Sequence, residues 1–146
     1  MSDGFIKALT LHEPWATLMK LGHKKIETRS WRTDYRGPLV IHAAKTMPEY
    51  ARDAMLDDGF TDILGFKDWK QFRPTLGCGL CLVELVACVP TTKLYVLQEI
   101  GWGKPHPSEA YFGNYDSGRW AWATRMIRVF EKPIPRSGER GLWNWM

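Results

Sequence analysis

The sequence predicts one α+β domain, a small β-barrel of about five to six strands with helices inserted between them. Three observations support this class. The 146 residues match the commonest size for one domain, strand-like apolar segments recur along the whole length, and helix start and stop signals stand between them. Residues 1–146 show no linker, repeat or low-complexity tract, so we expect a single domain. Closure into a barrel would cover the strand edges.

Short strands and helices are expected to alternate in the first half of the chain. Pro14 can begin a helix and Gly22 can end it, and Thr46-Met-Pro-Glu49 is a capping-box pattern with proline in the first turn. A turn sequence at residues 33–38 joins two strands. The predicted elements are strands at residues 5–11, 25–31 and 39–43 and helices at 14–21 and 48–58, followed by a helical turn and loop within 60–73.

The second half is dominated by two long strands. Residues 79–89 are the strongest strand candidate, and residues 119–130 are rich in β-branched and aromatic side chains. Between them we expect a short helix at residues 92–100 and a loop at 101–108, where glycine and proline are dense. The tail, residues 133–146, is predicted to be loop and short turns, held against the barrel by Trp143 and Trp145.

The composition indicates a cytoplasmic protein. No segment approaches the roughly 18 to 20 apolar residues that span a bilayer, and no secretory signal is visible at the start, so no membrane partner is expected. The three cysteines do not make a disulfide framework. Cys78 and Cys81 have C-x-x-C spacing, but no second ligand pair accompanies them and a strand follows, so we expect them to pack as small apolar residues. No metal site and no cofactor are predicted.

Charge is concentrated in blocks. Residues 20–45 have a local net charge of +5 and residues 119–140 one of +4, whereas residues 46–70 have one of −3. If the two basic blocks meet in space, they form a positive patch that attracts phosphates, with the acidic block elsewhere. Two separate solvated faces are the alternative.

Four segments, in order, resemble one family. Leu11-His-Glu-Pro-Trp15 precedes a G-x-K-x-x-E-x-R pattern formed by Gly22, Lys24, Glu27 and Arg29. The segments 35–45 and 112–122 continue the similarity. Together they resemble the ASCH domain, the module named after activating signal cointegrator-1 homology. The resemblance implies a PUA-like β-barrel with a cleft beside the signature, and a role in binding RNA.

The residue types at the signature suit a nucleobase. On a strand, Glu27, Arg29 and Trp31 leave the same face, with neighbouring members of the set roughly 6.6 Å apart, while Ile26 and Thr28 face the other way. An indole can stack on a base, a carboxylate can accept from an exocyclic amine, and a guanidinium can donate to phosphate or carbonyl oxygen. The alternative without a ligand is a salt bridge beside a packed tryptophan.

Other residues are candidates for the same cleft. Lys24 stands where the chain turns after Gly22. If its ammonium is desolvated, it could act as a base; if it is exposed, it could contact phosphate or be an ordinary surface lysine. Glu84 interrupts an apolar strand and could complete a site, with Glu109 as a second candidate. His42 is expected to be a hydrogen-bonded core residue. The remaining candidate binding residues are Trp15, Tyr115 and Arg119.

The main functional hypothesis is binding of single-stranded RNA or a modified nucleoside through a basic cleft. The alternative is hydrolysis, with Lys24, Glu27 and Glu84 as the catalytic set. Some small ASCH proteins are amidohydrolases that remove the acetyl group from N4-acetylcytidine, with a lysine at the position of Lys24 and a threonine three residues later; here that position holds Glu27. A ribonuclease is a further alternative, without a metal cluster or histidine pair to support it. A protein-interaction module is the third class.

Overall fold

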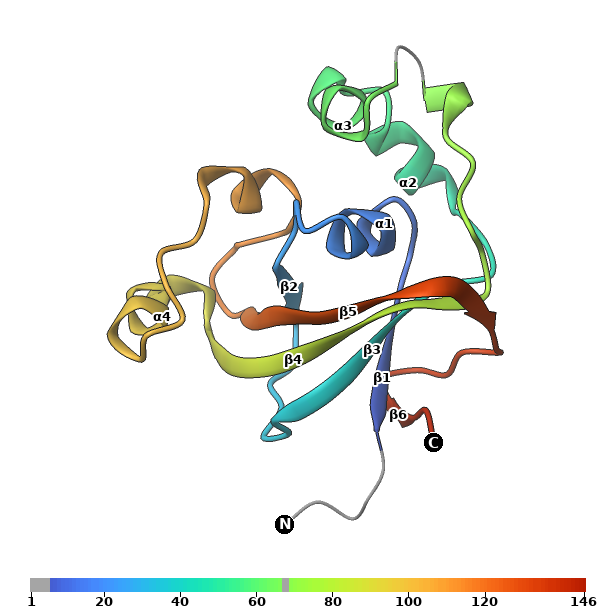
Figure 1. The fold of residues 1–146 in the computed structure, drawn as a ribbon. Coiled ribbons are helices and arrows are strands. Elements are labelled where there is room, and N and C mark those ends of the chain that lie inside the picture. The colour runs from blue at the N-terminus through green and yellow to red at the C-terminus, as the bar shows by residue number, and fades with distance from the viewer. Residues whose placement is uncertain (1–5, 67–68) are drawn as a thin grey trace.

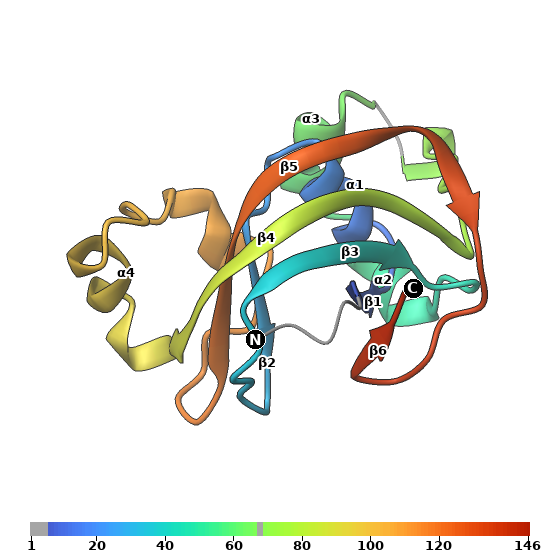
Figure 2. The same ribbon diagram turned by 60° about the horizontal axis from the view of Figure 1, so that its bottom comes forward.

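A curled sheet of six strands forms the centre of the protein, seen here in a computed structural model that describes residues 6–66 and 69–146. The strands are β1 (Lys7–Leu11), β2 (Ile26–Arg29), β3 (Gly37–Ala43), β4 (Cys78–Pro90), β5 (Trp120–Pro135) and β6 (Leu142–Asn144). Their order is β2-β5-β4-β3-β1-β6, and only β1 and β3 are paired in parallel. Figure 2 shows the sheet arched into a half-barrel. The predicted α+β class, with a barrel-like sheet and inserted helices, is confirmed.

The helices lie mainly on one side of this sheet (Figure 1). They are α1 (Trp15–Lys20), α2 (Glu49–Ala54), α3 (Asp58–Leu64) and α4 (Tyr95–Glu99), with 3-10 turns η1 (Trp69–Gln71), η2 (Thr91–Lys93) and η3 (Pro107–Tyr111). Helix α1 packs on β1, β3 and β4. A second apolar cluster joins α1 to the segments beyond it, through Leu18, Met55, Phe60 and Phe112. Within the described residues, no helix has the length and apolar character needed to cross a membrane.

The main core lies between α1 and the sheet. Alternation along β1, β3 and β4 turns Leu9, Ile41 and Val83 inward, where they contact one another and α1. Trp122 of β5 is fully buried in the same cluster. This core fixes β2 and β5 beside α1, and β2 is the strand that carries the signature residues.

Two expectations about the elements were wrong. The helix predicted at residues 48–58 is two helices, because Asp57 is extended and its side chain accepts from the backbone N–H of Gly59, which starts α3 anew. The tail is not all loop, since β6 pairs antiparallel with β1. Three residues are too few to show strand alternation, so tertiary pairing decides this element. The aromatic anchoring of the tail is confirmed, because Trp143 and Trp145 are buried against Ala8 and Val40.

Beyond Ala123, β5 continues with a partner on one side only. It pairs with β4 as far as Pro135, whereas β2 covers only the stretch from Trp120 to Ala123. In the described part of the chain this leaves one edge of β5 open. Exposed apolar side chains lie along this stretch, namely Met126, Ile127, Val129 and Ile134.

The cysteines and His42 have the structural roles expected of them. Cys78 and Cys81 are buried free thiols on β4, and burial raises the pKa of Cys81 to about 12, which leaves the thiol protonated and unreactive. His42 is buried; its Nδ1 lies 3.1 Å from the hydroxyl of Thr10 and its Nε2 lies 2.6 Å from the carbonyl oxygen of Arg136. Residues 6–66 and 69–146 contain no group of three or more metal-ligating side chains.

Replacing Trp143 by alanine tests the anchoring of the tail. The ring is 4% exposed, and its Nε1 donates to Thr10 Oγ1 over 3.1 Å, so Trp143→Ala should lower the free energy of unfolding by about 3–5 kcal/mol in urea titration. The control, Met146→Ala, removes a side chain that is 66% exposed and should change it by less than about 0.5 kcal/mol. Equal effects of the two variants would contradict the anchoring role.

Candidate nucleic-acid interface

A cavity of about 570 Å³ opens beside β2 and the start of α1; we call it cavity A. Helices α2 and α3 and the turn η3 close its other sides. The residues that line it are Thr10, Leu11, His12, Trp15, Glu27, Thr28, Arg29, Tyr50, Ala54, Phe60, Tyr111, Phe112, Gly113, Asn114 and Arg119. It therefore gathers three of the four segments that carry the family resemblance.

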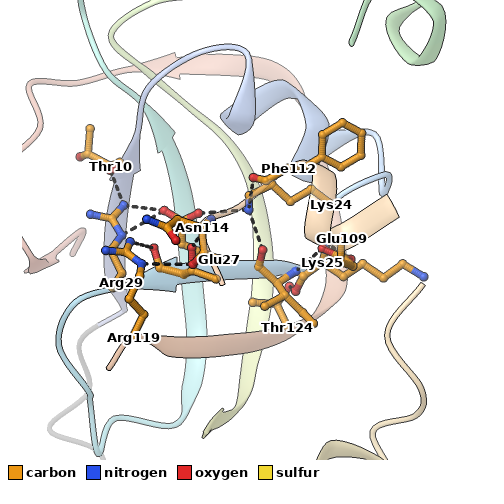
Figure 3. Close-up of polar contacts among 12 residues, drawn as sticks. Thr10, Lys24, Lys25, Glu27, Arg29, Glu109, Phe112, Asn114, Arg119 and Thr124 are labelled. Atoms are coloured by element: carbon orange, nitrogen blue, oxygen red, sulfur yellow. Dashed lines mark hydrogen bonds and ion pairs between the residues drawn. The ribbon is translucent and has the colours of Figure 1, made fainter. Parts of the chain in front are cut away.

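The side chain of Lys24 lies buried beneath this cavity. Its ammonium donates to the carbonyl oxygens of Ile26 over 2.6 Å and Phe112 over 3.1 Å, and its Nζ lies 3.2 Å from Glu27 Oε1. These three contacts occupy the three ammonium protons. Lys24 is thus neither the exposed phosphate contact nor the surface lysine considered from the sequence; it fixes β2, Glu27 and the segment after η3 together (Figure 3).

Glu27 and Arg29 form an ion pair with two contacts on the cavity wall. Glu27 Oε2 accepts a hydrogen bond from Arg29 Nε over 3.0 Å and lies 2.9 Å from Nη2 as an ion pair, while Arg29 Nη2 donates to the carbonyl oxygen of Thr10 over 3.0 Å. Burial, the largest single influence, opposes ionisation of Glu27, but the charges and hydrogen bonds of Lys24 and Arg29 outweigh it and lower the pKa of the carboxyl. Glu27 is therefore a fixed carboxylate, held in place on both oxygens.

A second arginine lies beside the Glu27–Arg29 pair (Figure 3). Arg119 donates from Nε to the carbonyl oxygen of Asn114 over 3.1 Å and from Nη2 to that of Thr28 over 3.2 Å (Figure 3). Neither Arg119 nor Arg29 has a hydrogen bond from its Nη1 among the described residues. Each arginine is therefore held through its Nε and Nη2, and its Nη1 is unused among the described residues.

The remaining wall is aromatic. Trp15 lies 6.0 Å from Tyr50 between ring centroids, tilted by 31°, and 6.2 Å from Phe60 in an edge-on arrangement. Tyr50 is largely exposed, whereas Phe60 is buried. Aromatic rings and charged groups thus line the same cavity, a combination that suits a nucleobase.

Comparison with known proteins identifies the family. A family model described as the ASCH domain matches residues 9–133. The chain belongs to the ASCH domain family.

Activating signal cointegrator 1 of Homo sapiens is 36% identical over 83 residues, as is the protein of the same name from Mus musculus. These residues make up 56% of this chain but only 14% of either relative. Among solved structures, an ASCH protein from Zymomonas mobilis has a TM-score of 0.49 and 14% identity, covering 91% of this chain and 75% of that one. A point mutant of that protein has a TM-score of 0.49 and 16% identity, covering 88% of this chain and 74% of the mutant.

Three of the predicted site residues are not brought to cavity A in this ASCH domain. Trp31 lies beyond the end of β2 and packs edge-on against Trp122, with 4.7 Å between ring centroids. Glu84 is exposed on β4, because its buried neighbours Val83 and Leu85 take the inner face. Tyr115 packs in an apolar cluster, and burial raises the pKa of its hydroxyl. The structure does not place Glu84 with Lys24 and Glu27.

Glu109 serves the backbone of β2. Its two carboxylate oxygens accept from the N–H groups of Lys25 over 2.8 Å and Ile26 over 3.2 Å. Burial raises the pKa of this carboxyl, against the pull of these N–H groups and of Lys24 and Lys25. Glu109 therefore ties η3 to the start of β2 and supports the site from behind.

Sequence reasoning missed several residues of cavity A. His12 stands inside the Leu11–Trp15 motif, lines the cavity, and has a buried Nδ1 without a hydrogen-bond partner in the described structure. Asn114 stands in the late matched segment, one residue before the tyrosine that was singled out. Tyr50 and Phe60 come from α2 and α3, whose role could be found only from the tertiary packing.

The two basic blocks do meet, because β2 pairs with the first residues of β5. Arg29 and Arg119 come from different blocks and line the same cavity. The expectation that the acidic block lies elsewhere is wrong, since α2 and α3 cover cavity A. They do so with apolar and aromatic side chains, while Asp53, Asp58 and Asp62 are exposed.

Replacing Glu27 by glutamine should destabilise the ASCH domain, because the buried ammonium of Lys24 loses its counter-charge. We expect Glu27→Gln to lower the free energy of unfolding at pH 7 by about 3 kcal/mol, measured in urea. The pKa of Glu27 is lowered in the fold, so its stabilisation is complete above the ordinary value of 4.5 and is lost as pH falls through the depressed pKa. The difference from wild type should therefore shrink in acid.

The matched control is Glu131→Gln, which removes an exposed carboxylate of β5. Its effect should stay within about 0.5 kcal/mol at either pH. A Glu27→Gln effect as small as this, or one that is unchanged in acid, would contradict the role of the buried pair.

Proposed function

We propose that cavity A binds RNA through an unpaired base or a modified nucleoside. The observation that carries this proposal is the fixed Glu27–Arg29 pair, which lines the same cavity as the aromatic rings of Trp15 and Tyr50. The cavity volume of about 570 Å³ lies in the range of small-molecule sites, roughly 300–1,000 Å³. The association of ASCH domains with RNA supports the same function.

The two sides of cavity A would have different tasks. A base can stack on the exposed ring of Tyr50 or on Trp15, a contact that accepts any base. Glu27 Oε1 has one contact, with Lys24, and keeps a further lone pair, and the His12 Nδ1 is a second polar group for a base edge. Stacking would give affinity, and these polar groups would give selectivity.

The cations of cavity A would hold phosphate or carbonyl oxygen. Arg29, Arg119 and the buried Lys24 face one carboxylate, Glu27, so the charges gathered here leave an excess of two positive charges. A low-dielectric wall of rings strengthens the field of these groups. RNA supplies both the flat base and the anion that this arrangement fits.

Binding is favoured over turnover because Lys24 is fully engaged. Its three protons are donated to Ile26, Phe112 and Glu27, and its side chain does not line cavity A. Glu84, the third member of the hydrolytic set, does not line it either. If the protein hydrolysed N4-acetylcytidine or cleaved RNA, the proposal that it binds without turnover would be overturned.

Tyr50→Ala tests the stacking wall. Binding of a fluorescent single-stranded RNA of about twelve nucleotides, followed by anisotropy, should weaken by about 5- to 150-fold, the measured range for loss of one base–aromatic stack. The control, Tyr95→Ala, removes a ring of equal exposure, 60% against 58%, that does not line the cavity. Equal affinities of the two variants would contradict stacking at cavity A.

Arg119→Ala tests the cationic side. The affinity for the same RNA should fall about tenfold, or ~1.4 kcal/mol, and the slope of log K against log salt should become shallower by about 0.7 for one lost phosphate contact. Arg128→Ala is the control, since it removes an exposed arginine of β5 that lies outside the cavity. If the slope of log K against log salt were unchanged in Arg119→Ala, a phosphate contact by Arg119 would be contradicted.

A turnover assay completes the test. N4-acetylcytidine and the RNA itself, incubated with stoichiometric protein, should be recovered unchanged by chromatography. Conversion to cytidine, or chain cleavage, that is lost in Lys24→Met would assign a hydrolase instead.

A further inference from the structure

A second cavity lies on the other side of η3, and the function proposed for cavity A does not use it. This cavity B has a volume of about 680 Å³. Five of its lining residues bear basic nitrogen, namely His23, Lys25, Lys104, His106 and Arg125, and Trp102 and Met126 add apolar surface. No lining residue is shared with cavity A.

The charge in cavity B is almost entirely positive. Among its lining residues Glu109 is the one carboxylate, and it is 3% exposed with both oxygens turned to the backbone N–H groups of Lys25 and Ile26. Burial also favours its neutral form. Lys25, Lys104 and Arg125 therefore leave an excess of positive charge in a concave site.

These cations are available to a ligand. Lys25 and Lys104 are exposed, and neither has a carboxylate within ion-pair distance in the described part of the chain. Arg125 donates from Nη2 to the carbonyl oxygens of Gly101 over 3.0 Å and Trp102 over 3.4 Å, which orients the guanidinium and leaves its other N–H groups unused. One cation is thus held by hydrogen bonds and two are exposed without an ion pair, and lysine and arginine are the side chains that contact phosphates.

Cavities A and B are neighbours, because nearby residues of the same segments line them. Lys24 belongs to the network of cavity A, whereas the next residue, Lys25, extends away from it (Figure 3) and lines cavity B. On α3, Phe60 lines cavity A and Ile63 lines cavity B, a rise of roughly 4.5 Å along the helix. A strand of RNA seated in one cavity can therefore reach the other with its adjoining nucleotides.

We propose that cavity B binds backbone phosphates of the same RNA strand whose base occupies cavity A. This inference rests on the function proposed above and extends it from one nucleotide to a strand. It also accounts for the meeting of the two basic blocks of the sequence, since Lys25 belongs to one block and Arg125 to the other. The site recognises charge and carries no base selectivity.

The test is the double variant Lys25→Ala/Lys104→Ala. With single-stranded RNA of about twelve nucleotides, the salt slope should become shallower by about 1.4, for two phosphate contacts, and the affinity at about 0.1 M salt should fall at least tenfold. The control, Lys45→Ala/Lys132→Ala, removes two exposed lysines that line neither cavity and should keep the wild-type slope. Equal melting temperatures of both double variants would show that folding is intact.

The outcomes separate the two proposals. If Tyr50→Ala and Arg119→Ala weaken binding while the cavity B variant matches its control, the strand path is overturned and the function of cavity A stands. If only the cavity B variant loses affinity, the base site is overturned, and with it the path from one cavity to the other. A polyglutamate chain of similar length that binds as tightly as RNA, with the same dependence on Lys25 and Lys104, would show an acidic-protein site and overturn the inference. Absence of RNA binding in the wild type would overturn both proposals.

Discussion

The arrangement of this ASCH domain depends on one buried ammonium. Lys24 joins two parts of the chain that are distant in sequence, since it donates to Ile26 and Glu27 on β2 and to Phe112 after η3. A buried cation is costly unless every proton is satisfied, so the positions of these three groups are coupled. Because Glu27 in turn orients Arg29, the geometry of the cavity wall follows from a charge that does not itself line the cavity.

The same coupling explains why carboxylates close to each other have different roles. Glu27 faces two cations and stays ionised despite burial, whereas Glu109 is desolvated and bound to backbone N–H groups, and its burial raises its pKa. Glu27 thus lines cavity A, whereas Glu109 supports the strand that carries Glu27. Two glutamates on adjacent segments differ in function because of their surroundings, not their chemistry.

Local pattern was sufficient for β1 to β5 and for α1, because each carries its own alternation or its own end signals. The alternation of β2 also placed Glu27 and Arg29 correctly on one face, since Ile26 and Thr28 are buried. The local sequence pattern could not predict how deeply each side chain is buried or which distant segments lie beside it. It placed Trp31 in line with Glu27 and Arg29, but the strand ends before it, and it could not show that Tyr50 from α2 would face Trp15. The burial of Lys24 likewise depends on the carbonyl group of Phe112, which lies 88 residues away in the sequence.

The open edge of β5 has a consequence for how copies of the domain behave at high concentration. An unpaired strand with apolar side chains is a template on which other chains can add, the route by which sheet proteins form fibrils. Here Pro133 and Pro135 lack the N–H groups that such stacking needs, and Arg128 and Lys132 would face their own copies in a parallel, in-register contact. The edge of β5 is thus unpaired in the single chain, but these residues oppose the addition of further chains that would start a fibril.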